Sequence, residues 1–182
     1  MNLTLNKHIS CIVFAISLFL TFSPSSHIAQ MNISQAMTPT QYVNNVLLGE
    51  GVIATNVSFT GQMDQIGYMT DGMLIGLESG IILSTEVATN PASCVLVNCD
   101  FCVNPGIEPD LLSVANSVPL LIGETFVVNS VNDVCILEFD FQPSGDFVSF
   151  NYIFGSNEYE SWENTQYNDI FAFFLSGPGI DG

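Results

Sequence analysis

Carboxylate and amide side chains gather around a turn in the last third of the sequence. Asn157 and Glu158 lie in the segment GSNEYE, and Asn168 and Asp169 directly precede the apolar run IFAFFL. Oxygen atoms of these types are the ligands that Ca²⁺ prefers, roughly six to eight at a time. The four side chains are therefore the candidate ligands of a calcium site. No EF-hand spacing is present, and a solvated acidic rim on a β-rich domain is the alternative interpretation.

The N-terminus has the organisation of a secretory signal. A polar start containing Lys7 is followed by 14 mostly apolar residues from Ile9 to Phe22 and then by the small, polar stretch SPSSHIA. This order is typical of a signal peptide, and the apolar run is shorter than the roughly 20 residues that span a bilayer. We expect cleavage after Ala29, a mature domain of residues 30–182, no integral membrane span after cleavage, and a secreted or cell-surface location.

Removal of residues 1–29 leaves a chain without any basic side chain. Lys7 is the only Lys or Arg and both His residues lie before residue 30, so the mature chain has 18 Asp and Glu and a formal charge of −18. Nucleic acid is excluded as a partner, because no side chain can neutralise its phosphates. Every carboxylate must be solvated, bind a backbone N–H, or bind an external cation.

The same composition restricts catalysis. Without His or Lys, the mature chain has no Ser–His or Cys–His nucleophile, no Schiff base and no P-loop. A carboxylate pair of the glycosidase type, such as Glu158 with Asp169, remains the enzymatic alternative. It would require a separation of about 5–5.5 Å in a retaining enzyme or about 6.5–9.5 Å in an inverting one.

The mature chain keeps an even number of cysteines. These four residues are Cys94, Cys99, Cys102 and Cys135. In an exported protein they predict two disulfides, in which Cys135 pairs with one of the three upstream cysteines. A zinc knuckle or reactive thiols at the CxxC sequence are the alternatives.

The remaining pattern predicts a mostly β protein, a β-sandwich or jelly roll with one or two short helices. A capped helix is expected from Thr38, and Asp110 to Asn116 could form a helical turn. CILEFDF, from Cys135 to Phe141, alternates like a strand. We also expect strands at Phe147 to Phe154 and at Ile170 to Leu175, the latter buried on both faces.

Several segments of the sequence resemble the choice-of-anchor L domain family. They are Gly80 to Thr85 (GIILST), Val134 to Phe141 (VCILEFDF), Gly145 to Phe150 (GDFVSF), Tyr152 to Tyr159 (YIFGSNEY) and Asn168 to Ile180 (NDIFAFFLSGPGI). Two positions depart from the family's pattern: Glu86 stands where a Gly is usual, and Asn157 replaces an acidic residue. The second change removes one potential carboxylate ligand from the candidate calcium site.

The resemblance implies an exported protein, chiefly of Bacteroidetes-type bacteria, and carries over no catalytic residue. It also implies further strands after the SGPGI segment, whereas the sequence ends at Gly182. We therefore expect an incomplete domain with an unpaired edge, which would aggregate alone. The predicted function is a non-enzymatic surface module for adhesion or binding of a glycan or protein ligand. A carbohydrate-active enzyme or accessory module and a structural spacer are the alternatives.

Overall fold

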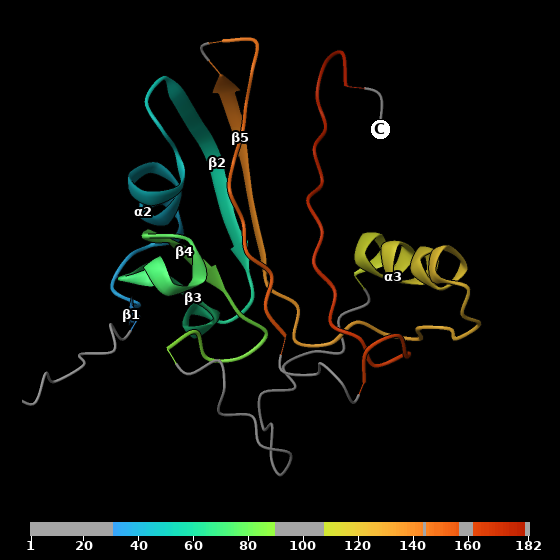
Figure 1. Ribbon diagram of the computed structural model, residues 1–182. Helices are drawn as coiled ribbons and strands as arrows, with labels where there is room; N and C mark the ends of the chain where they lie inside the picture. Colours follow the sequence, from blue (N-terminus) through green and yellow to red (C-terminus); the bar gives the residue numbers. More distant parts are fainter. Residues whose placement is uncertain (1–30, 90–107, 144, 157–161, 181–182) are drawn as a thin grey trace, which may run out of the picture. The chain divides into compact units, whose positions relative to one another are not determined.

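The computed structural model describes residues 31–89, 108–143, 145–156 and 162–180. Its regular structure consists of two small antiparallel sheets and short helical elements (Figure 1). The β-rich fold class is thus confirmed, whereas the layering of a β-sandwich or jelly roll is not. The signal segment, the upstream cysteines Cys94, Cys99 and Cys102, and the pair Asn157 and Glu158 lie outside the described residues.

The first sheet has the order β1-β3-β4, with strands Asn32–Ser34, Ile66–Thr70 and Ser79–Leu83. Its central strand, β3, is buried on both faces: Ile66 is fully buried on one, and Gly67 is buried on the other. A Cβ atom at Gly67 would lie 2.7 Å from Cγ2 of Ile33 on β1. The glycine therefore allows close packing in the middle of this sheet.

A capped helix supplies two of the three largest fully buried side chains among the described residues. Helix α2 (Pro39–Tyr42) continues as the π-helical turn η1 (Val43–Leu47), and the side chains of Thr38 and Gln41 form a reciprocal capping box at its start. Tyr42 and Val43 are fully buried, and the Tyr42 hydroxyl donates a hydrogen bond of 3.3 Å to the Ser34 carbonyl. The predicted helix start at Thr38 is confirmed.

The second sheet pairs β2 (Val52–Thr60) with β5 (Ile136–Pro143), side by side in Figure 1. The register shifts between Thr55 and Ser58, where Asn56 has a φ of +52°. This β-bulge inserts one residue, so Val57 faces the same side of the sheet as Ala54. The bulge thereby keeps the half-buried residues of β2 on one face.

Helix α3 (Pro109–Ile122) is longer than the expected helical turn. Glu108 caps its start by accepting a hydrogen bond from the Asp110 N–H (3.3 Å), and Gly123, with a φ of +78°, ends it. The Asn116 side chain donates to the Val128 carbonyl (2.9 Å) and accepts from the Val128 N–H (3.0 Å). These two bonds attach the segment that follows α3 to the helix.

Two strand predictions are wrong. Residues 147–154 and 170–175 form no regular strand, and Phe171 and Phe173 of the second run are exposed rather than buried on both faces. Composition predicted strands because the runs are rich in aromatic and β-branched residues. A strand, however, also requires a hydrogen-bonded partner, which these runs do not have among the described residues.

Candidate functional site

The two non-strand runs meet through their aromatic rings. Phe150 and Phe173 have ring centroids 4.2 Å apart, and Tyr152 and Phe171 are 5.6 Å apart. Phe154 stacks on Phe171 at 6.2 Å. The residue number rises from 150 to 152 on the first run while that of its partner falls from 173 to 171 on the second, so the two runs are antiparallel. We call Phe150, Tyr152, Phe154, Phe171 and Phe173 the aromatic ladder.

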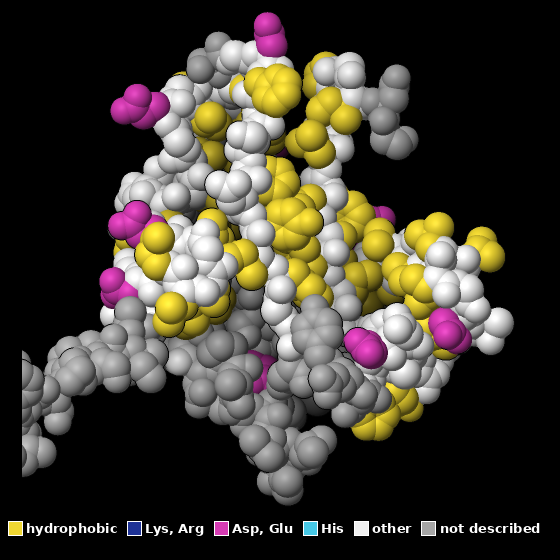
Figure 2. All heavy atoms as spheres, viewed as in Figure 1, with side chains coloured by type: hydrophobic (Ala, Val, Ile, Leu, Met, Phe, Trp, Pro, Cys, Tyr) yellow, Lys and Arg dark blue, Asp and Glu magenta, His cyan; other side chains and the backbone are white. Residues whose placement is uncertain are grey.

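The aromatic ladder is open to solvent. Tyr152 is 60% exposed, Phe173 is 56% exposed, and the neighbouring Phe147 is 92% exposed. Figure 2 shows many hydrophobic side chains on the viewed surface of the described residues, with scattered carboxylates and no Lys, Arg or His side chain. Aromatic pairs of this geometry attract one another, but their outer surfaces remain available for a further contact.

A short hydrogen-bonded turn precedes the second run. The Thr165 hydroxyl donates to the Trp162 carbonyl (2.6 Å) and accepts from the Tyr167 N–H (3.2 Å). The rings of Trp162 and Tyr167 meet edge to face at 5.5 Å. These contacts stabilise the turn that directly precedes Asn168 and Asp169.

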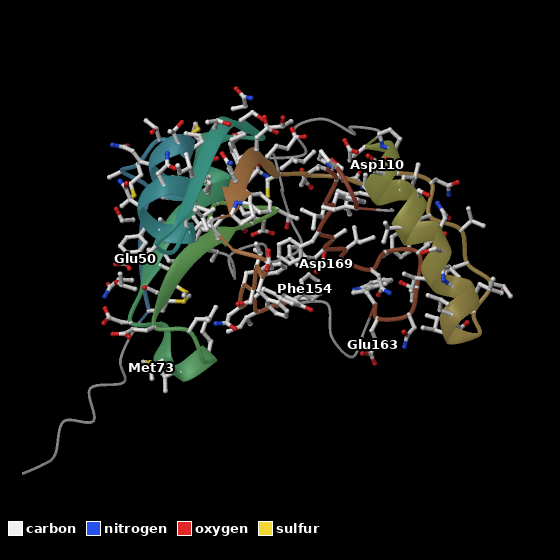
Figure 3. All side chains as sticks on the ribbon, turned by 90° about the horizontal axis from the view of Figure 1, so that it is seen from above. Glu50, Met73, Asp110, Phe154, Glu163 and Asp169 are labelled. Carbon is white, nitrogen blue, oxygen red and sulfur yellow. The ribbon has the colours of Figure 1, made fainter. Side chains whose placement is uncertain are left out.

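Only half of the candidate calcium site is described. Asn168 is exposed and donates its backbone N–H to the Thr165 carbonyl (3.3 Å), while the Asp169 carboxylate accepts a hydrogen bond from the Ser156 hydroxyl. Figure 3 shows Asp169 together with Phe154 from the other run. The Ser156–Asp169 contact brings Asp169 close to the residue that precedes Asn157.

The described residues do not themselves complete a metal site. Within residues 31–89, 108–143, 145–156 and 162–180, no three His, Cys, Asp or Glu side chains gather as metal ligands. The separation of Glu158 from Asp169, on which the glycosidase alternative depends, lies outside this part of the chain. Calcium binding and glycosidase chemistry at these residues therefore remain predictions.

A polar group that sequence analysis missed lies on the exposed face of the β2–β5 sheet. The Asn56 side chain donates to the Asp140 carboxylate (2.6 Å), and the Ser58 hydroxyl donates to the Glu138 carboxylate (3.4 Å). The alternation of CILEFDF predicts that Glu138 and Asp140 share a face, and both are exposed. Their cross-strand partners depend on the bulge. The sequence signal for it is the alternation of VIATNVSF, in which the half-buried residues Ala54 and Val57 are three positions apart across Asn56.

Cys135 is the candidate disulfide residue that the structure describes. Its thiol is half-buried and unbonded to any described cysteine, and its three candidate partners lie outside the described residues. Burial raises the pKa of the Cys135 thiol to about 11, despite the opposing effect of backbone hydrogen bonds from Ser84 and Cys135. A free thiol at this position would be protonated at neutral pH and would react slowly.

Both aromatic runs are evident in the sequence, but their ring-to-ring contact was not predicted. The signal that could have revealed it is the period-two spacing of the rings, at 150, 152 and 154 on one run and at 171 and 173 on the other. Side chains at alternate positions of an extended segment share one face. Two such faces of similar length predict an aromatic interface between the runs.

A family model described as the choice-of-anchor L domain matches residues 30–181. No curated protein and no solved structure matches the chain. In the described part of the chain, no helix has the length and apolar character needed to cross a membrane.

Proposed function

Because the chain belongs to the choice-of-anchor L domain family, we propose that it is a non-enzymatic surface module that binds a protein ligand. Family membership indicates a surface-associated module, and the family is not known as an enzyme family. The signal-like segment at residues 1–29 supports export as the route to the surface.

The exposed aromatic ladder is the observation that carries the proposal. An aromatic side chain buries about 150–250 Å² when fully covered, so covering the exposed half of one ring removes about 100 Å² from water. At about 25 cal/mol per Å², each ring would contribute about 2–3 kcal/mol before the cost of association is subtracted. Exposed apolar clusters of this kind are typical of interaction sites.

The chemistry of the ladder favours a protein over a glycan. Four of its five rings are phenylalanine, and the run from 147 to 154 offers few side-chain hydrogen-bonding groups, namely those of Ser149, Asn151 and Tyr152. A glycan is dense in hydroxyl groups, and those that face this surface would have to give up water with few partners in it. A protein can instead cover the rings with apolar side chains.

The test measures binding of the full chain to arrays of immobilised peptides and immobilised glycans. We expect binding to a subset of peptides, reduced at least tenfold by Phe150→Ser or Phe173→Ser because these rings meet at 4.2 Å. Val127→Ser is the matched control, since Val127 is also about 60% exposed but lies outside the ladder. Binding confined to glycans, or unchanged by the ladder variants, would overturn the proposal.

A further inference from the structure

Both aromatic runs combine exposed rings with backbone N–H and C=O groups that make no hydrogen bond to another described segment. In the part of the chain that the structure describes, no backbone hydrogen bond joins residues 147–155 or 169–176 to any segment. The register of the ring contacts is nevertheless that of neighbouring antiparallel strands. An extended backbone with unpaired N–H and C=O groups is a template for an added strand.

The charge around the ladder is of one sign. Asp146 directly precedes the first run and Asp169 directly precedes the second, and both are exposed. Because the runs are antiparallel, these carboxylates lie toward opposite ends of the ladder. Residues 30–182 contain no Lys, Arg or His, so no side chain of the mature domain can neutralise them.

We propose that the aromatic ladder binds an extended segment of another protein by strand addition, and that this segment has an apolar centre and Lys or Arg toward both ends. The inference rests on the proposed function and specifies the partner at the same site. Main-chain hydrogen bonds to the unpaired runs would provide affinity, and apolar side chains would cover the rings.

The charges select this occupant over a second copy of the chain. Two copies would each bring a formal charge of −18 in their mature form, and their like charges would oppose association. Lys and Arg would instead meet Asp146 and Asp169 at the ends, and cations also interact favourably with aromatic faces. A basic segment therefore has attractive contacts that a second copy does not have.

The probe is a synthetic peptide of about ten residues, with alternating valine and threonine in the centre and a lysine pair at each end. One control peptide replaces lysine by glutamate, and another carries N-methyl groups at alternate backbone amides. With the full chain, titration calorimetry is expected to show at least about tenfold weaker binding for each control. Hydrogen exchange should slow at the amides of residues 147–155 or 169–176 when the lysine peptide binds.

Variants of the chain test the charge contribution separately. Asp146→Asn is expected to weaken binding of the lysine peptide about two- to fivefold, the usual effect of one surface charge pair. Glu124→Gln is the matched control, because Glu124 is also exposed but lies in the segment after α3. An equal effect of both variants would refute a role for the ladder's own carboxylate.

Three results would overturn the inference. The first two are binding of the glutamate peptide, or of the N-methylated peptide, as tight as that of the lysine peptide. The third is slower hydrogen exchange of the two runs when the chain associates with itself at rising protein concentration. If any of these results occurs while binding to the peptide array still depends on Phe150 and Phe173, the inference fails and the proposed function stands. If no peptide binds in either experiment, both fail.

Discussion

The β-bulge at Asn56 provides the sharpest test of how this sequence determines its second sheet. Asn56 has a φ of +52° and inserts one residue opposite β5. Deleting it leaves the sequence VIATVSFT, in which the half-buried residues Val52, Ala54, Val57 and Phe59 occupy alternate positions. Alternate residues of a strand share one face, so the shortened strand keeps these side chains on the same face without the bulge.

The expected cost is small because no half-buried side chain changes face. The deletion removes the 2.6 Å hydrogen bond from Asn56 to Asp140, which is exposed and contributes about 0.5–1 kcal/mol. We expect a total destabilisation of no more than about 1 kcal/mol.

Urea unfolding of the full chain, followed by circular dichroism, measures this effect. Asn56→Gly is the matched control: glycine adopts the positive φ without strain, so the variant loses only the side-chain hydrogen bond and should cost less than about 1 kcal/mol. Asn56→Val keeps the chain length but places a β-branched residue at positive φ, at a cost of about 1–3 kcal/mol. The deletion should resemble Asn56→Gly, and the reasoning is refuted if the deletion costs as much as Asn56→Val or more.

Three further predictions follow from the structure and the sequence. Gly72→Ala places a Cβ 2.3 Å from the Leu77 carbonyl oxygen, so in urea titration it should lower the free energy of unfolding by about 1–3 kcal/mol or more. Gly80→Ala is the control: the space around Gly80 is open, so this variant should be nearly neutral. In the reduced chain, the pKa of the Cys135 thiol is about 11 in the folded state, against 9.0 for the ordinary thiol. The free energy of unfolding should therefore be constant below pH 9 and fall by about 2–3 kcal/mol as the pH rises to 11. Cys135→Ala should remove this pH dependence. Millimolar Ca²⁺ should raise the Tm through the predicted site, less so in Asp169→Asn, and identical melting curves with Ca²⁺ and with chelator would count against it.

Local signals allowed much of the fold to be predicted. The capped helix start at Thr38 follows from Thr38 as the N-cap and Pro39 at the first helical position. The strand at β5 follows from strict alternation, which places Glu138 and Asp140 outward and Phe139 inward. In each case the information lies within a few residues of the element that it determines.

The errors arise where structure depends on contacts between distant segments. Strand propensity at 170–175 is strong, but pairing is set by the partner rather than by the run itself. The hydrogen bonds of Asn56 and Ser58 likewise depend on how β2 meets β5, some 80 residues later in the chain. The candidate site shows the same division: the composition of the turn suggested Asp169, whereas its contact with Ser156 required the two runs to approach.

The lack of basic residues links the stability of this domain to its binding surface. Since residues 30–182 hold no Lys, Arg or His, carboxylates such as Asp140 are held by neutral donors, here the Asn56 amide. Such bonds leave the negative charge uncompensated, so every exposed carboxylate can still attract a cation. A partner or ion that brings positive charge would therefore bind and stabilise the domain through the same interactions. The basic strand proposed for the aromatic ladder and Ca²⁺ at the predicted turn would both act in this way, and added salt should weaken the first by screening its surface charge pairs.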